Sequence, residues 1–157
     1  FLLPYSQLKF LPLKTPGHTN NHICYLHPQM AFTGDCLFSA GMGRVFTEQY
    51  SEQFHSLEKI LNHLSTNTPI YCGHEYTLEN LKFAQQLDEN NIEIEKMLKY
   101  AQQQYKKSLP TLPTTLEREL KINPFLKLVH ESKHLTAEEK KASIYKFKKL
   151  RERKDAA

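Results

Sequence analysis

Residues 70–76, with the sequence IYCGHEY, lie near the middle of the chain, and the composition changes across them. Before them come short apolar runs separated by Gly, Pro, Asn and Asp; after them come long, charged segments with helical periodicity and no Gly. Residues 69–72 favour a strand, and Gly73 permits a sharp turn that presents His74 at the end of that strand. His74 is therefore either a metal ligand or base, or an ordinary turn residue.

Length and composition predict a soluble, cytoplasmic protein. The 157 residues are 39% hydrophobic and 24% charged, which is typical of a globular domain. No apolar run approaches the roughly 20 residues of a membrane span, and the apolar residues 1–4 are too few for the core of a signal peptide. The chain begins at Phe1, in a run that favours a strand, so we expect it to be part of a longer polypeptide.

The cysteines give no indication of a local metal or disulfide motif. Cys24, Cys36 and Cys72 are odd in number, widely spaced and without a C-x-x-C pair. This pattern predicts neither a disulfide framework nor a thiolate zinc site, and it fits a reducing cytosol.

Positive charge is concentrated near the end of the chain. The formal net charge is +4, and residues 140–154 contain eight Lys or Arg against one Glu. Such a helix is a solvated face, a nucleic-acid patch or a clamp for an anionic small molecule. Because no recognised nucleic-acid motif accompanies it, we expect no nucleic-acid partner.

The pattern of apolar residues predicts a sheet-forming first half and a helical second half. Strands are expected over residues 1–13, 23–26, 30–33 and 69–72, with a helix starting near Ser51 before the last strand. Further helices are expected over residues 78–87, 94–105, 116–122 and 137–153. The last helix is preceded by Thr136 with Glu139 three residues later, which is the pattern of a capping box.

Three ends of strands offer residues that bind metals. His18, Asp35 and His74 supply two imidazoles and a carboxylate, a sensible donor set for zinc, iron or manganese. Their spacing is not that of a local metal motif, so convergence of the three is a hypothesis. The other histidines are interpreted as surface or supporting groups; they are His22, His27, His55, His63, His130 and His134.

Several motifs, taken together, resemble one enzyme family. They are TPGHT at 15–19, FTGD at 32–35, YCGHEYT at 71–77, NLKFA at 80–84 and NPF at 123–125. The chain resembles the hydroxyacylglutathione hydrolases, or glyoxalase II enzymes, of the metallo-β-lactamase fold. The resemblance implies an α/β fold: residues 1–76 form the C-terminal half of an αββα sandwich, and residues 77–157 form a helical, glutathione-binding domain.

The resemblance also implies a reaction and its metals. The family hydrolyses S-(2-hydroxyacyl)glutathione thioesters, converting S-D-lactoylglutathione to D-lactate and glutathione in methylglyoxal detoxification. Two divalent metal ions are implied, zinc first and iron or manganese as alternatives, with His18 on one, His74 on the other and Asp35 bridging them. The family's His-x-His-x-Asp-His motif does not occur in this chain. We therefore expect this chain to be an incomplete portion of the enzyme, whose missing N-terminal half carries that motif; the complete enzyme is expected to be a monomer.

The same resemblance assigns the substrate contacts. Arg44, Phe46, Tyr76, Arg151 and Lys154 are implied to hold glutathione, and Arg suits a carboxylate through its fork of donors. The family often has Tyr where Phe46 stands, which removes one hydroxyl contact.

Three other interpretations remain open at the level of sequence. A persulfide dioxygenase of the same fold also uses glutathione but holds a single iron. A non-catalytic module would keep the glutathione clamp without a working metal centre. A nucleic-acid binder would use the basic residues 140–154, and its binding would depend steeply on salt.

Overall fold

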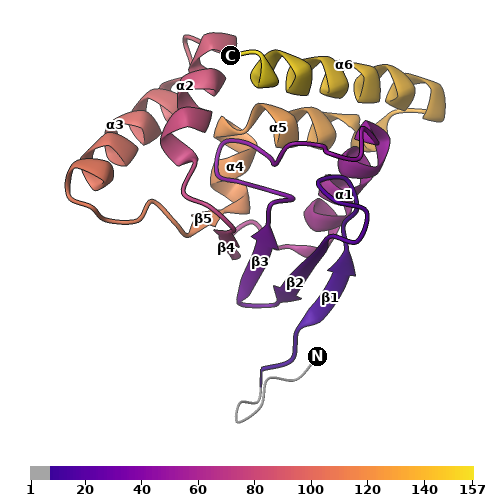
Figure 1. The fold of residues 1–157 in the computed structure, drawn as a ribbon, viewed down its shortest axis with the longest axis horizontal. Helices are drawn as coiled ribbons and strands as arrows, with labels where there is room; N and C mark the ends of the chain where they lie inside the picture. Colours follow the sequence, from indigo (N-terminus) through magenta and orange to yellow (C-terminus); the bar gives the residue numbers. More distant parts are fainter. Residues whose placement is uncertain (1–7) are drawn as a thin grey trace.

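The computed structural model describes residues 8–157 as a sheet with helices packed along one side and one end (Figure 1). The strands are β1 (Leu11–Lys14), β2 (Ile23–His27), β3 (Met30–Gly34), β4 (Pro69–Cys72) and β5 (Thr114–Thr115). The α-helices are α1 (Tyr50–His63), α2 (Thr77–Leu87), α3 (Ile92–Lys106), α4 (Leu116–Ile122), α5 (Pro124–Glu131) and α6 (Ala137–Asp155), and Ser132–His134 form a short 3₁₀ turn. The first seven residues of the expected N-terminal strand lie outside the described part. Within residues 8–157, no helix combines the length and apolar character needed to cross a membrane.

The strands follow one another across the sheet in the order β1-β2-β3-β4-β5. β1, β2 and β3 pair antiparallel, β3 and β4 pair parallel, and β5 pairs antiparallel with β4. The predicted succession of three strands, a helix and a fourth strand is confirmed, because α1 connects β3 to β4. Parallel neighbours end at the same edge of a sheet. The segments that follow β3 and β4 are therefore brought together.

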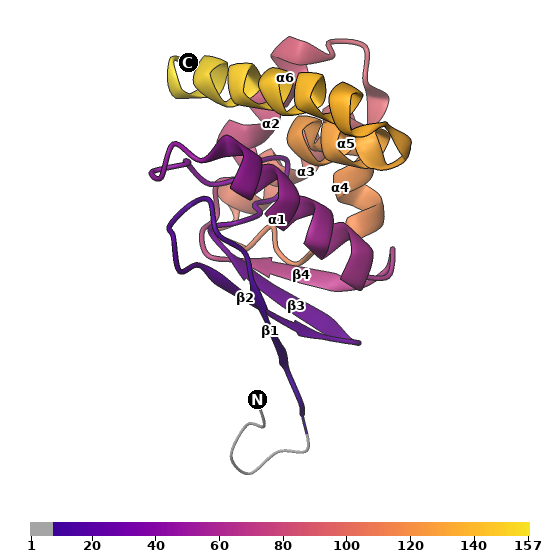
Figure 2. The same cartoon turned by 90° about the vertical axis from the view of Figure 1, so that its right-hand side faces the viewer.

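The two faces of the sheet differ in what covers them. On the inner face, Cys24, Leu26, Ala31 and Ile70 are buried beneath the helices. Side chains alternate between the faces of a strand. The intervening residues therefore form an outer apolar face, which consists of Ile23, Tyr25, Phe32 and Tyr71, each 39–41% exposed. Figure 2 shows α1 along one side of the sheet and no described element over the other.

The core runs from the sheet into the C-terminal helices. One hydrophobic cluster joins the inner face of the sheet to α1, α5 and α6. At its centre the ring of Phe147 lies edge-on to Phe54 and Phe125, with centroid distances of 5.4 and 5.8 Å. The division into domains at residues 76 and 77 stays a prediction, and the helices beyond it share this core.

Helix ends follow from side-chain capping. The capping box before α6 is confirmed: the Glu139 amide donates to Thr136 Oγ1 at 3.3 Å, and the Thr136 amide donates to Glu139 Oε2 at 2.9 Å. The start expected near Ser51 is one residue late, because α1 begins at Tyr50. Asn123 ends α4, and its side-chain oxygen accepts from two amides of the next turn, which starts α5 directly.

A buried carboxylate fixes the loop that follows β3. Glu119 is fully buried and accepts hydrogen bonds from the Ala40 amide at 2.8 Å, the Thr114 hydroxyl at 2.7 Å and the Asn123 amide group at 3.0 Å. Burial raises the pKa of this carboxyl. One side chain of α4 thus ties the loop to β5 and to the start of α5.

We predict that Phe125→Ala destabilises the chain by about 3–5 kcal/mol, because Phe125 is fully buried and its removal leaves a cavity. Urea unfolding followed by circular dichroism measures this change. Tyr105→Ala is the control: Tyr105 is 74% exposed, so the free energy of unfolding should change by no more than about 0.5 kcal/mol. Equal losses in both variants would contradict a core centred on Phe125.

Candidate active site

Three loop residues from separate strand ends converge at one edge of the sheet. His18 lies in the connection between β1 and β2, Asp35 follows β3, and His74 follows β4. The Nε2 atoms of His18 and His74 lie 3.3 and 3.7 Å from the same oxygen, Oδ2 of Asp35. The three residues therefore converge, as hypothesised from the sequence. Their function stays a proposal.

Glycines make this convergence possible. A Cβ on Gly73 would lie 2.3 Å from Oδ1 of Asp35, and one on Gly43 would lie 2.0 Å from the Asp35 carbonyl oxygen. The Gly73 amide also donates to the Gly34 carbonyl at 2.9 Å. Only a residue without a side chain allows the backbone to approach Asp35 this closely.

The contacts of His18 turn its Nε2 toward Asp35, where it can bind a cation. Its Nδ1 lies 2.8 Å from the Arg44 carbonyl oxygen, which can only accept, so Nδ1 carries a proton. In the neutral ring, Nε2 then presents a lone pair toward the Asp35 carboxylate. A positive charge between these two atoms is stabilising, and either a proton on Nε2 or a bound cation supplies it. Imidazole nitrogen and carboxylate oxygen are both ligands for divalent metals.

His22 supports Asp35 through the backbone. The Asp35 amide donates to Nε2 of His22 at 3.3 Å, and Nδ1 of His22 lies 2.8 Å from the Thr15 hydroxyl. The sequence analysis placed His22 among surface or supporting groups, and the structure assigns it the supporting position.

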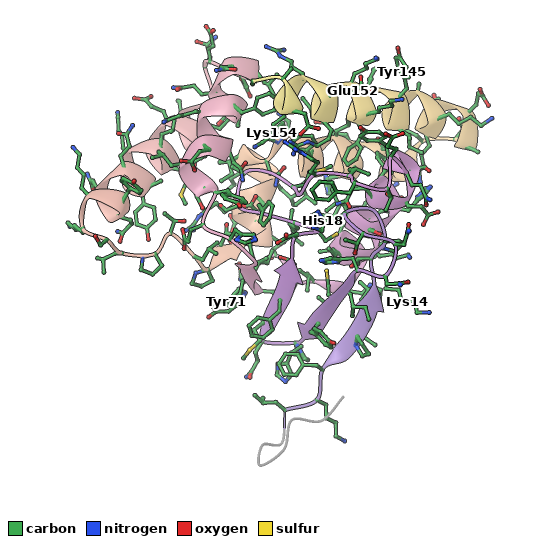
Figure 3. All side chains as sticks on the ribbon, in the orientation of Figure 1. Lys14, His18, Tyr71, Tyr145, Glu152 and Lys154 are labelled. Carbon is green, nitrogen blue, oxygen red and sulfur yellow. The ribbon has the colours of Figure 1, made fainter. Side chains whose placement is uncertain are left out.

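A cavity of about 400 Å³ opens beside these residues. It is lined by every residue that the sequence analysis proposed for metal or substrate: His18, Asp35, Arg44, Phe46, His74, Tyr76, Arg151 and Lys154. Figure 3 shows His18 at the loop end of the strands and Lys154 near the C-terminal end of α6. The cavity therefore has two imidazoles and a carboxylate at one end, which are residues of the kind that bind metals, and cationic side chains at the other.

Asp155 organises the two arginines at the cationic end. Its Oδ1 accepts from Nη2 of Arg151 at 2.6 Å and from Nε of Arg44 at 3.2 Å. Arg151 also donates to the Met42 carbonyl at 2.9 Å. Nε of Arg151 donates to Oδ2 of Asp155 at 3.3 Å, so all three nitrogens of buried Arg151 are engaged within the chain. The side chain of Arg44, by contrast, is 60% exposed.

Lys154 is the cation most affected by its surroundings. Its ammonium group donates to Oδ1 of Asn80 and lies 5.3 Å from the centroid of the Phe83 ring. Burial, reinforced by the Arg151 guanidinium, lowers the pKa of Lys154 to about 8. Its charge therefore changes within the pH range in which enzymes are commonly assayed.

Aromatic rings form the walls between the two ends. Tyr76 stacks on the His74 ring with centroids 5.0 Å apart, and Phe38 meets Tyr76 edge-on at 5.3 Å. Phe46 lies 5.2 Å from the His18 ring and is 64% exposed. Its ring can pack on a ligand but offers no hydroxyl.

The structure adds residues that the sequence analysis did not single out. Asn80 holds Lys154 and donates from its amide to the Ser39 carbonyl at 2.9 Å, and Asp155 joins the arginines. Asn80 stood within the NLKFA motif, which was a usable signal. Asp155 stands four residues after Arg151, which is the spacing of an ion pair on a helix, but its contact with Arg44, 111 residues away, had no local signal.

Solved structures show the class of fold. ETHE1 from Myxococcus xanthus matches 93% of this chain with a TM-score of 0.51 and 23% identity, covering 56% of its own length. A metallo-beta-lactamase from Staphylococcus aureus matches 95% of this chain with a TM-score of 0.51 and 20% identity, covering 40% of its own length. The chain therefore has a metallo-β-lactamase type of fold.

Sequence comparison identifies the family within that fold. The family model described as hydroxyacylglutathione hydrolase C-terminus matches residues 75–157. A hydroxyacylglutathione hydrolase from Pseudoalteromonas translucida is 45% identical over 73% of this chain and 44% of its own length. A relative from Arabidopsis thaliana, named hydroxyacylglutathione hydrolase cytoplasmic, is 42% identical over 78% of this chain and 50% of its own length. The chain belongs to the hydroxyacylglutathione hydrolase family, and it spans about half the length of these relatives.

We predict that Gly73→Ala weakens manganese binding at the Asp35 carboxylate by roughly 10–100-fold, the usual effect of disturbing groups that orient a ligand. The new Cβ would displace Asp35. Electron paramagnetic resonance of Mn²⁺ measures the affinity without interference from thiols, which this ion does not favour.

Gly41→Ala is the matched control for that measurement. The three atoms nearest to a Cβ on Gly41 all belong to the Asn80 side chain, at 2.7–2.9 Å, and none to Asp35, so manganese affinity should be unchanged. The interpretation is wrong if both alanines weaken manganese binding equally.

Proposed function

We propose that the protein hydrolyses S-(2-hydroxyacyl)glutathione thioesters, converting S-D-lactoylglutathione to D-lactate and glutathione, and that this chain supplies part of the enzyme. One observation carries the proposal: a single cavity holds the His18, Asp35 and His74 cluster at one end and the Arg44 and Lys154 cations at the other. Membership of the hydroxyacylglutathione hydrolase family supports the same reaction.

The donor set fits a pair of divalent ions, with zinc as the first candidate and iron or manganese as alternatives. His18 and His74 would each hold one ion, and the Asp35 carboxylate would be shared between the two ions. Bound metal of this kind polarises a carbonyl and supplies hydroxide near neutral pH. A catalytic zinc normally has three protein ligands. This chain offers two for each ion, so we propose that the upstream half of the protein provides the others.

The remaining steps belong to side chains of this chain. Arg44 and Lys154, with Arg151 behind them, would bind the carboxylates of the glutathione part through charge-assisted hydrogen bonds. Tyr76 and Phe46 would pack against the substrate between the carboxylate clamp and the thioester. The departing thiol has a pKa of about 8.5 as in cysteine, so it can leave as a thiolate without a strong general acid.

The outer apolar face of the sheet is the proposed contact with the upstream half. Its four members come from β2, β3 and β4, and the rings of Phe32 and Tyr71 stack with centroids 5.4 Å apart. A second sheet packed there would bury them, as in a sandwich of two sheets. We propose a cytoplasmic, monomeric complete enzyme whose partner is its thioester substrate, without a nucleic-acid or membrane partner.

Thiol release from S-D-lactoylglutathione tests the proposed reaction. A zinc-loaded chain extended to the full length of the relatives should release thiol, and Asp35→Asn in that chain should lower the rate by at least about 100-fold, more than the 10–100-fold cost of losing a supporting group. Asp88→Asn is the matched control. Asp88 ends α2 and does not line the cavity, so the rate should be unchanged.

The same assay on the 157-residue chain tests whether the upstream half must provide some of the metal ligands. We expect no turnover from it alone; turnover by this chain would mean that His18, Asp35 and His74 suffice. If the extended chain also releases no thiol but binds glutathione whether or not metal is removed, the protein is a non-catalytic glutathione-binding module and the hydrolase proposal fails.

We predict that substrate binding weakens as pH rises through about 8. The pKa of Lys154 is lowered to about 8, so its positive charge is present below this pH and lost above it. A hydrogen bond to a charged group contributes about 1.5–3 kcal/mol, so KM of the extended enzyme should rise roughly tenfold or more. Lys154→Arg should abolish the rise, because arginine stays protonated. If KM of Lys154→Arg rises with pH in the same way, a group other than Lys154 causes the rise.

A further inference from the structure

Soft metal-binding atoms meet in the interior beneath the candidate active site. One donor atom each from His22, Cys24 and Cys36 lies within 4.8 Å of the others. Both cysteines are fully buried, and His22 is half-buried. The three residues lie outside the group formed by His18, Asp35 and His74, and the proposed reaction does not use the two thiols.

The pairing of β2 with β3 brings the two cysteines together. The Cys24 thiol lies 3.4 Å from the Thr33 carbonyl oxygen, and the Cys36 amide donates to that same oxygen at 3.1 Å. Twelve residues separate the cysteines in sequence. The sequence analysis predicted no thiolate site because it considered close spacing, and here the sheet provides the proximity.

A hydroxyl lies beside the group. Oγ1 of Thr15 lies 3.2 Å from Sγ of Cys24 and 2.8 Å from Nδ1 of His22. A tetrahedral zinc-like ion has bonds of about 2.3 Å to sulfur and 2.0–2.1 Å to nitrogen, which places its ligands about 3.5–3.8 Å apart. The donor atoms of His22, Cys24 and Cys36 lie within 4.8 Å of one another, so they need to approach by no more than about 1.3 Å to reach this geometry.

We propose that His22, Cys24 and Cys36 form a second metal site, which takes a thiophilic divalent cation of the zinc and cadmium class. On binding, each thiol releases its proton to solvent and becomes a thiolate ligand, the imidazole binds in its neutral form, and no electron is transferred. Thiolate ligands select soft cations, whereas the candidate active site offers only nitrogen and oxygen. The two sites therefore differ in the ions that they prefer.

A cation bound at this second site would affect the candidate active site through the single lone pair of the neutral His22 ring. A neutral imidazole has a single lone pair, and in His22 the Asp35 amide donates to it. A cation bound to His22 takes that lone pair, so the Asp35 amide loses its acceptor. The thiophilic site and the orientation of Asp35 thus compete for the same ring.

Cadmium absorption spectroscopy on the reduced, full chain tests the site, because only thiolate ligands produce the sulfur-to-cadmium charge-transfer band in the ultraviolet. We expect the band to saturate with Cd²⁺, and to be largely lost in Cys24→Ser and in Cys36→Ser. Cys72→Ser is the matched control and should keep the band, since Cys72 is not part of the group. Asp35→Asn should keep it as well, which separates this test from the proposed hydrolase activity.

Cadmium-113 NMR is measured on the unsubstituted chain, so its result does not depend on whether the cysteine variants fold. The chemical shift reports the number of sulfur ligands, and we expect a signal from an ion with two. Absence of both the band and this signal would overturn the proposal. A band that persists undiminished in Cys36→Ser, or is lost in Cys72→Ser, would overturn it too.

Discussion

Parallel pairing of β3 with β4 is the constraint on which the candidate active site depends. It places the residues after both strands at one edge, and a hydrogen bond of 2.9 Å from the Gly73 amide to the Gly34 carbonyl joins the two turns. The absence of a side chain at Gly73 leaves room for the Asp35 carboxylate. His74 then faces that carboxylate from the neighbouring strand. The proposed metal site is a direct result of this backbone geometry.

The helical half provides the opposite end of the cavity through contacts of a different kind. Glu119 accepts three hydrogen bonds in the interior and fixes the loop that leads to Arg44. Arg151 is held by Asp155 and the Met42 carbonyl, so it serves as a rigid support, while Lys154 lies above Asn80 and the Phe83 ring. The cations are therefore positioned before any ligand arrives, which lowers the entropic cost of binding an anion.

Local patterns in the sequence predicted most elements and singled out His18, Asp35 and His74, whereas the residues expected to contact substrate came from the family resemblance. Short apolar runs bounded by turn-forming residues predicted the strands, and helical spacing with Thr136 and Glu139 predicted α6. The convergence of His18, Asp35 and His74 rested on resemblance, because pairing between strands is not written in local spacing. Helix α5 was not predicted, since a helix can begin directly at Asn123 where another ends. The contact between Cys24 and Cys36 was also missed, because pairing of strands in the sheet creates it and local spacing does not show that pairing.

The outer apolar face also has a thermodynamic consequence. Unfolding a protein raises its heat capacity because buried apolar surface becomes hydrated, by about 12–15 cal/mol/K per residue in ordinary domains. In the described chain, Ile23, Tyr25, Phe32 and Tyr71 are partly hydrated in the folded state already. When the chain unfolds, these four side chains therefore add less to the heat capacity than they would if another surface covered them in the folded state. Any apolar surface that covers the face will lower the heat capacity on association, whatever its sequence.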